Sequence, residues 1–394
     1  MKADTETDIL IAGAGPAGLA AAAALGTEGH RVLLVDPAAP VVDANAPGAD
    51  LRTTALLQPA RDLLDRAGVW DGLAPGATAL WTMRIVDAAA APPVARDFEA
   101  RDISDAPFGW NVRNAVLRRA LLDRIGALPN VQTRFGTSAT ALFVRDAAAR
   151  VTLADGMRVT ARLVLACDGR ESPLREMAGI RTRRADYGQT AITFAVTHEA
   201  PHRDVSTEVH ASGGPFTLVP LASGDDGHRS AIVWMDDARA QTRRMTLSDA
   251  AFLAEAQARS ADAMGALALA SPRAAWPIVS VLAERWTARR LALAAEAAHA
   301  MPPIGAQGLN TSLKDVAAIR DLAATGEPGA PDMLARYERD RRADVALRMA
   351  GIDLLNRTSL AGLAPVQALR RAGIVALHDL PPLRRAIMRL GLGA

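Results

Sequence analysis

A G-x-G-x-x-G pattern at residues 13–18 constrains the fold of this chain more than any other feature. The apolar run 8–12 precedes it, the alanine-rich run 19–26 follows it, and the apolar run 31–36 ends in Asp36. This order predicts a strand, a tight turn, a helix and a parallel strand, which together form a dinucleotide-binding unit. The alternative is a glycine-rich turn without a ligand, and the flanking strands, the helix and the distal acid count against it.

Each residue of the pattern has an expected role. Gly13 allows the tight turn, Gly15 lets the backbone approach a pyrophosphate, and Gly18 lets helix and strand pack closely. The helix that starts here offers free N–H groups and a positive dipole to phosphates. Its first two residues, Pro16 and Ala17, belong to the predicted cofactor contacts. The acid that ends the second strand can accept hydrogen bonds from an adenosine ribose.

Composition excludes several other classes of function. The single cysteine, Cys167, excludes a disulfide framework, a cysteine zinc site and an iron–sulfur cluster. The chain has only two lysines and no phosphate-binding P-loop pattern. It also lacks a metal-binding H-E-x-x-H pattern and a nucleic-acid recognition motif, and only 4% of its residues are aromatic. We therefore predict no metal ion and no nucleic-acid partner.

The N-terminal apolar stretch does not have the features of a targeting segment. Residues 10–25 are interrupted by glycines and are preceded by three acids, whereas a signal peptide has a basic start and an unbroken apolar core. No uncharged apolar stretch is long enough to span a membrane. We expect a cytoplasmic protein, and peripheral attachment to the inner membrane stays open.

Two later segments repeat the pattern of an apolar strand that runs into an acid. The run 163–167 leads into Asp168 and Gly169. The run 291–294 leads to Glu296, after which a proline- and glycine-containing loop precedes a helix predicted from about Asn310.

The three motifs, in this order, resemble the FAD-dependent aromatic hydroxylases of the para-hydroxybenzoate hydroxylase fold. More narrowly, the chain is similar to the ubiquinone-biosynthesis hydroxylase family, from about residue 8 to its C-terminus. Further matching segments lie at residues 50–56, 108–114, 276–277 and 337–344. The resemblance implies an α/β fold, with a Rossmann-like FAD-binding domain, an inserted antiparallel-sheet substrate domain and a helical C-terminal region.

The resemblance and the apolar patterns together predict a division of the chain into three parts. The alternating runs 190–197, 216–221 and 230–234 predict an antiparallel sheet. The expected parts are a discontinuous FAD-binding domain at 1–80, 106–185 and 280–328, a substrate domain at 81–105 and 186–279, and a helical region at 329–394.

The C-terminal region is basic. Residues 330–394 hold eleven arginines and six acids, interleaved with leucine, isoleucine and methionine. This pattern suggests contact with a membrane surface or a multi-enzyme complex. A solvated arginine-rich helical face is the alternative, and the oligomeric state stays open.

The resemblance also implies cofactor contacts. Arg52 matches the arginine that neutralises the pyrophosphate, and Asn114 matches a contact from a helix start. Asp168 and Gly169 match a turn that serves FAD and the incoming nicotinamide. Glu296 matches the acid that binds the ribityl chain. The family usually has Gly-Asp at this point where the chain has Ala-Glu, and a glutamate keeps two acceptor oxygens.

The loop that follows matches the segment that passes the flavin. The N–H groups of Leu309 and Asn310 are expected to point at the flavin pyrimidine edge, where they stabilise negative charge on the reduced ring. Pro303 matches the place where the substrate ring is positioned. His299 stands beside the loop as an acid–base candidate, although a lone histidine is more often structural. The loop glycines complete the predicted contacts, and they are Gly305 and Gly308.

The function predicted from these features is an FAD-dependent monooxygenase that uses NAD(P)H and O2 to hydroxylate an aromatic ring, with a prenylated phenol of ubiquinone biosynthesis as substrate. With a single dinucleotide fold, the nicotinamide binds transiently or a separate reductase supplies electrons. The alternatives are a hydroxylase of a soluble aromatic compound, a reductase on the same fold, an NAD-dependent dehydrogenase, and a non-catalytic FAD-fold scaffold.

Overall fold

The glycine pattern lies where the sequence predicts, in the turn that joins the first strand to the first helix. The computed structural model describes residues 4–43, 46, 49–88, 93–211, 213–224, 227–360, 373, 376 and 378–392. It begins with strand β1 (Thr5–Ala12), helix α1 (Pro16–Thr27) and strand β2 (Val32–Asp36). Strands β1 and β2 pair in parallel, which confirms the predicted unit.

This unit is the centre of an eight-stranded sheet. The order is β18-β19-β11-β1-β2-β8, and β10 and β9 extend the sheet from β11. The pairs from β19 through β8 are all parallel, so their carboxyl ends share one edge. The further strands are β8 (Val131–Phe135), β9 (Ala139–Val144), β10 (Ala149–Leu153), β11 (Arg158–Ala166), β18 (Thr287–Ala288) and β19 (Leu291–Leu293).

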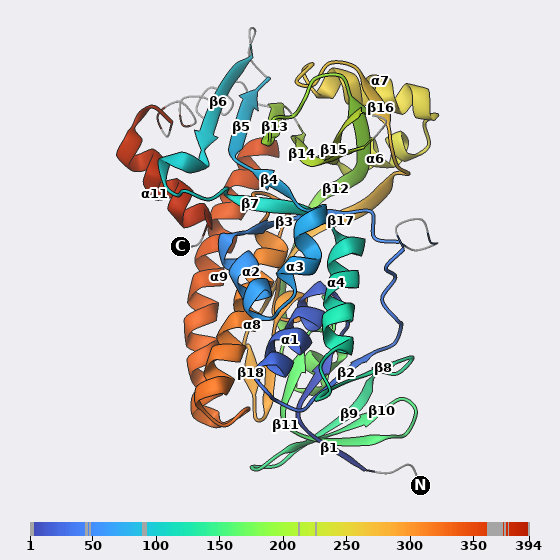
Figure 1. Cartoon of the computed structure of the whole chain (residues 1–394), viewed down its shortest axis with the longest axis vertical. Helices are drawn as coiled ribbons and strands as arrows, with labels where there is room; N and C mark the ends of the chain where they lie inside the picture. The colour runs from blue at the N-terminus through green and yellow to red at the C-terminus, as the bar shows by residue number, and fades with distance from the viewer. Residues whose placement is uncertain are drawn as a thin grey trace.

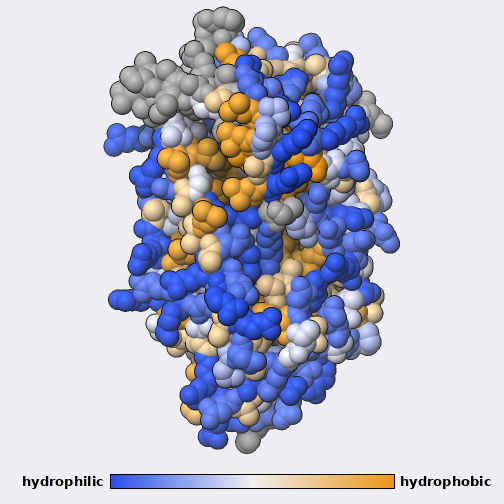
Figure 2. Space-filling view, turned by 90° about the vertical axis from the view of Figure 1, so that its left-hand side faces the viewer, coloured by the Kyte–Doolittle hydropathy of each residue, from blue (hydrophilic) through white to orange (hydrophobic). Residues whose placement is uncertain are grey.

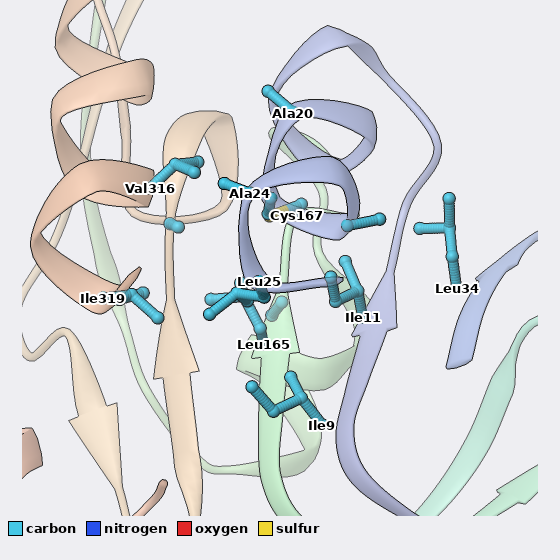
Figure 3. Close-up of a cluster of buried hydrophobic side chains, with 14 of the residues drawn as sticks. Ile9, Ile11, Ala20, Ala24, Leu25, Leu34, Leu165, Cys167, Val316 and Ile319 are labelled. Carbon is cyan, nitrogen blue, oxygen red and sulfur yellow. The ribbon is translucent and has the colours of Figure 1, made fainter. Parts of the chain in front are cut away.

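Helix α1 packs between this sheet and two neighbouring helices, α4 (Asn114–Gly126) and α8 (Gln307–Thr325). Its alanines are buried, and their small side chains let the helix approach the strands closely. Figure 3 shows Ile9, Ile11 and Leu165 from the sheet meeting Leu25 from α1, with Ile319 of α8 alongside. This apolar contact fixes α1 against the face of the sheet.

A second sheet has nine strands in the order β20-β17-β12-β15-β14-β13-β5-β6, with β16 paired to β12. The three alternating runs lie in β12, β14 and β15, which pair antiparallel as predicted. One pair, β13 with β5, is parallel. The strands are β5 (Thr82–Asp87), β6 (Val94–Glu99), β12 (Thr182–His198), β13 (Val205–Ala211), β14 (Gly214–Gly224), β15 (Gly227–Asp237), β16 (Leu267–Leu269), β17 (Ala274–Ala283) and β20 (His299–Ala300).

Short elements connect the two large sheets. Strands β3, β7 and β4 form a small antiparallel sheet at the middle of the molecule, and α6 and α7 cover one face of the nine-stranded sheet (Figure 1). These elements are β3 (Thr53–Leu57), β4 (Thr78–Leu80), β7 (Gly109–Arg113), α2 (Gln58–Arg66), α3 (Trp70–Leu73), α5 (Pro173–Met177), α6 (Ala238–Met245) and α7 (Asp249–Arg259).

The C-terminal part is helical. Helix α9 (Pro331–Leu360) runs along one side of the molecule, and α11 (Pro381–Leu392) lies near its upper end in Figure 1. The arginines at 370 and 371 lie outside the described residues. Within the described ranges, no helix is both long and apolar enough to cross a membrane. The predicted α/β fold class, with a second sheet and a helical C-terminal region, is confirmed.

Candidate functional site

Four motifs from distant parts of the sequence meet at the carboxyl edge of the parallel strands. Ala12 of β1 is in register with Val35 of β2 and with Ala166 of β11, and Ala166 is in register with Leu293 of β19. The residues that follow each strand therefore lie next to one another. Open α/β sheets bind their ligands at this edge.

The three glycines of the turn are required for different reasons. Gly13 has a φ of +103°, and a Cβ there would lie 2.2 Å from the carbonyl oxygen of Cys167. A Cβ on Gly18 would lie 1.8 Å from the oxygen of Gly13. Gly15 differs, because its φ is −67° and a Cβ would have no atom within 4 Å. Packing within the protein explains the first two glycines, and the space beside Gly15 fits a ligand.

The start of α1 offers free donors to this space. Its N-cap residue is Gly15, which has no side chain, so the first N–H groups of the helix have no side-chain acceptor. Pro16 and Ala17 form its first turn. Asp36 holds the turn in place, since its two carboxylate oxygens accept hydrogen bonds from the N–H groups of Ala14 (2.6 Å) and Ala38 (2.9 Å). Each oxygen keeps a further lone pair for a ribose hydroxyl.

Asp168 has an unsatisfied oxygen at the same edge. Its Oδ2 accepts a hydrogen bond from the N–H of Leu174 at 3.2 Å, while its Oδ1 is buried without a partner in the described part of the chain. Burial raises the pKa of Asp168, and Ser172 and the N–H of Leu174 offset this only partly. Gly169 continues the chain with a φ of +87°. A buried acceptor without a donor is what a cofactor hydroxyl would satisfy.

The predicted ribityl acid, Glu296, projects toward solvent. Its side chain is 53% exposed and its carboxylate lies 3.3 Å from Nε of Arg170. The residue before it, Ala295, has a left-handed φ of +56°, and its N–H donates to Asp315 at 3.0 Å. Glycine adopts this conformation without steric cost. The left-handed backbone conformation at position 295 therefore explains why the family usually has a glycine here.

Replacing Ala295 with glycine should stabilise the protein. A left-handed conformation costs a residue with a Cβ about 1–2 kcal/mol, and the greater flexibility of glycine in the unfolded chain removes part of this gain. We expect Ala295→Gly to raise the free energy of unfolding by about 0.5–1 kcal/mol in urea titrations. Ala297→Gly, in the same turn but without a positive φ, is the control and should destabilise. Equal effects of the two changes would contradict this account.

Arg52 lies in a charged cluster directly before β3. Its guanidinium bonds both oxygens of Asp50 at 2.8 Å. Asp50 also accepts hydrogen bonds from Nδ2 of Asn114 (2.9 Å) and from Arg118 (3.1 Å). Burial alone would raise the pKa of Asp50, but its bonds to Arg52 and Asn114 and the charge of Arg118 lower it overall. The sequence predicts no role for Asp50 or Arg118. The spacing of Asp50 and Arg52, two residues apart, was the available signal that these two side chains could pair.

Arg52 is also close enough to Glu296, the predicted ribityl acid, to sense its charge. Hydrogen bonding to Asp50 raises the pKa of Arg52, and the charge of Glu296 adds to this effect. The guanidinium also lies 4.6 Å from the ring centroid of Trp276. Asn114 begins helix α4 as predicted, but its Oδ1 accepts from Thr54 (2.8 Å), so both ends of its amide are engaged within the protein.

Helix α8 begins at Gln307, three residues earlier than predicted. Gly305 and Ala306 both adopt left-handed φ values, +62° and +57°, and this turns the chain abruptly into the helix. Because the N-cap carbonyl accepts the first intrahelical bond, the N–H of Asn310 is used within the helix. The expectation that it points at the flavin is therefore corrected, and the free donors are the N–H groups of Gly308 and Leu309.

The Asn310 side chain has a structural role. Its Oδ1 accepts from the N–H of Leu57 (2.8 Å) and its Nδ2 donates to the carbonyl of Ala55 (2.7 Å). These bonds tie the first turn of α8 to β3. The start of α8 is thereby held beside the small central sheet.

The loop before α8 faces an apolar cluster of the nine-stranded sheet. Ile304 packs with Ala191, Met235 and Ile278, while Pro303 is exposed. The contact of Pro303 with a substrate ring stays a prediction. The apolar cluster provides the kind of surface that an aromatic ring requires.

His299 forms a buried hydrogen bond with Asp315. Its Nε2 lies 2.6 Å from Oδ2 of Asp315, and its ring stacks on Trp286 with centroids 5.1 Å apart. Arg341 donates to the other oxygen of Asp315 at 2.9 Å. This arrangement favours the structural alternative for His299. Arg341 belongs to a segment whose pattern matched the family, but the pattern did not indicate its partner.

Comparison with known proteins shows the family of the chain. The profile of a family described as "FAD binding domain" matches residues 6–350. The ubiquinone hydroxylase UbiL of Rhodospirillum rubrum is 36% identical to the chain, over 100% of the chain and 91% of that protein. The chain belongs to the ubiquinone-biosynthesis FAD-dependent hydroxylases. The 3-demethoxyubiquinol 3-hydroxylase of Escherichia coli is 28% identical, over 98% of each chain.

Solved structures show the same fold for this hydroxylase. The p-nitrophenol 4-monooxygenase PnpA of Pseudomonas putida has a TM-score of 0.81 at 19% identity, covering 99% of both chains. The probable FAD-dependent monooxygenase PqsL of Pseudomonas aeruginosa has a TM-score of 0.76 at 23% identity, covering 94% of this chain and 100% of its own. The protein is an FAD-dependent monooxygenase, with O2 as co-substrate and NAD(P)H as the donor typical of the class.

Proposed function

We propose that this hydroxylase transfers one oxygen atom from O2 to the ring of a prenylated phenol in ubiquinone biosynthesis, at the cytoplasmic surface of the inner membrane. The observation that carries the proposal is the meeting of four motifs at one sheet edge, where the Cβ position of Gly15 is open and the buried Oδ1 of Asp168 has no partner among the described residues. The relatives named for ubiquinone hydroxylation support the substrate class.

In this proposal the residues at the sheet edge hold FAD. The start of α1 and the open side of Gly15 receive the pyrophosphate, with Arg52 as the nearby positive charge. Asp36 accepts from the ribose, and Asp168 and Glu296 accept from further cofactor hydroxyls. The free N–H groups at the start of α8 stabilise negative charge at the pyrimidine edge. FAD supplies the reduction of O2 and the oxygen transfer.

The nine-stranded sheet covers the substrate side in the proposed division of the chain. The segments 81–105 and 186–279 contribute most of its strands, and the FAD-binding part is formed by 1–80, 106–185 and 280–328. The apolar cluster around Ile304 would hold the phenol ring and exclude water from it. An apolar tail requires an apolar path leading away from this cluster.

The test begins with the visible spectrum of the purified protein and the mass of its released cofactor. We expect about one FAD per chain. Consumption of NAD(P)H and O2 should then rise when a short-tailed prenylated phenol is added, and isotope-labelled O2 should label the product. A matched phenol without the tail should be a poorer substrate. Bound FAD without phenol-dependent oxidation would support a scaffold, and a preference for the untailed phenol would support the hydroxylase of a soluble aromatic compound.

A further inference from the structure

The C-terminal helices carry most of the exposed apolar side chains of the described protein. Nine large hydrophobic residues are exposed, and only Phe143 and Met177 lie elsewhere. Figure 2 shows this side of the molecule, with hydrophobic residues gathered in its upper half. We call the seven others the C-terminal apolar face, and they are Leu347, Leu354, Leu355, Leu380, Leu383, Ile387 and Leu390. A concentration of this kind marks an interaction site.

Helix α11 is apolar on two sides, and only one side is explained by packing. Met388 and Leu392 are buried in a cluster with Phe98 and Phe108. Leu383, Ile387 and Leu390 recur with a spacing of four and three residues, so they share one face of the helix. They remain 38–57% exposed. The fold of the chain itself does not account for this outward stripe.

Unpaired positive charge flanks the stripe. Arg385 and Arg389 are exposed, and among the described residues neither forms an ion pair. Two copies of the chain joined by a two-fold axis would bring the same arginines together at one interface. An anionic lipid surface would instead neutralise them while its acyl boundary accepts the apolar stripe. The combination of charges therefore favours a membrane over a second copy.

The face is continuous with the loop at the candidate active site. The carbonyl of Gly391 accepts from Nε2 of Gln307, the first residue of α8, at 3.0 Å. Arg348 of α9 donates to Oε1 of Gln307 (3.0 Å) and to the carbonyl of Leu390 (3.4 Å). The end of α11 is therefore fastened to the helix whose start faces the proposed flavin position.

We infer that the C-terminal apolar face docks on an anionic lipid bilayer and holds the loop before α8 at the bilayer surface. This inference rests on the proposed function, because a phenol with a long apolar tail resides in the bilayer. Docking through α9 and α11 lets the ring leave the membrane beside Ile304 while the tail stays in lipid. The acyl boundary then replaces water over the exposed leucines.

Vesicle flotation of the FAD-loaded full chain tests this inference. We expect it to float with phosphatidylcholine vesicles that contain phosphatidylglycerol, and less with phosphatidylcholine alone or at high salt. The triple change Leu383→Ser, Ile387→Ser and Leu390→Ser should weaken binding by roughly tenfold or more, because it removes the apolar side chains that would insert into the acyl boundary.

Two further variants complete the design. Arg385→Glu with Arg389→Glu should remove the preference for phosphatidylglycerol, because the two charges that attract an anionic surface are reversed. Phe143→Ser on β9 is the matched control, because Phe143 is 58% exposed but lies outside the C-terminal apolar face. It should bind as the unchanged protein does. The flavin absorbance of each variant verifies that it is folded.

The outcomes separate this inference from the proposed function. Unchanged flotation of the α11 variants, or no flotation of the natural chain, overturns the inference. A dimer in sedimentation velocity that the triple variant splits would assign the face to a second copy and also overturns it. Flotation is measured without turnover, so it tests membrane docking independently of catalysis. A protein that binds vesicles through α11 but does not hydroxylate short-tailed phenols would contradict only the proposed function.

Discussion

Gly15→Val should abolish FAD retention in a protein that still folds, whereas Gly18→Val should prevent folding. The backbone of Gly15 is in an ordinary extended conformation and its Cβ position is open, so the protein itself tolerates the side chain. The added methyl groups occupy the approach of the pyrophosphate. A phosphate bond to a backbone N–H contributes about 1.5–3 kcal/mol, so the loss of one or more predicts a roughly hundredfold weaker affinity.

Gly18→Val is the matched comparison, since the same side chain is added three residues away. Its Cβ would overlap the carbonyl oxygen of Gly13 at 1.8 Å, and the resulting shift should cost more than about 3 kcal/mol. Circular dichroism measures folding, and flavin fluorescence titration of the apoprotein measures affinity. A Gly15→Val protein that purifies with a full complement of FAD would show that the cofactor lies elsewhere.

The parts of the site that sequence could predict are those whose chemistry is local. The strand, turn and helix around residues 13–18 form from neighbouring residues, and an acid that ends an apolar run locates the carboxyl edge of a parallel sheet. Asp36, Asp168 and Glu296 were predicted in this way. Asp36 is the last residue of β2, Asp168 follows β11 and Glu296 follows β19, and these strands belong to one parallel part of the sheet. The glycine turn was predictable because only glycine fits at positions 13 and 18.

The parts that sequence could not predict depend on pairings across the fold. Asp50 and Arg118 are 68 positions apart, and the pairing of β3 with β7, the strand that leads into α4, brings them together. The early start of α8 depends on a left-handed alanine, Ala306, a conformation that an alanine in a sequence does not indicate. For the same reason the sequence does not indicate that Ala295 adopts a left-handed conformation in its turn.

Asp315→Ala should be among the most destabilising single changes in this chain. Asp315 is fully buried and pairs with His299, Arg341 and the N–H of Ala295. Its removal leaves a buried guanidinium and an imidazole without their acceptor, which costs about 3–5 kcal/mol. The turn before Glu296 also loses its anchor, so FAD affinity should fall in whatever fraction of the protein folds. Urea unfolding monitored by tryptophan fluorescence measures the first effect.

Asp340→Ala is the control for the loss of an aspartate, because Asp340 pairs with Arg339 at an exposed position on α9. We expect it to change stability by less than about 1 kcal/mol. His299→Gln separates the structural role from an acid–base role, since glutamine retains an N–H donor toward Asp315. On the structural account the variant loses stability, but the folded, FAD-loaded fraction hydroxylates at close to the natural rate with an unchanged pH profile. A collapse of kcat in fully folded, FAD-saturated protein would instead assign the proton-transfer role to His299.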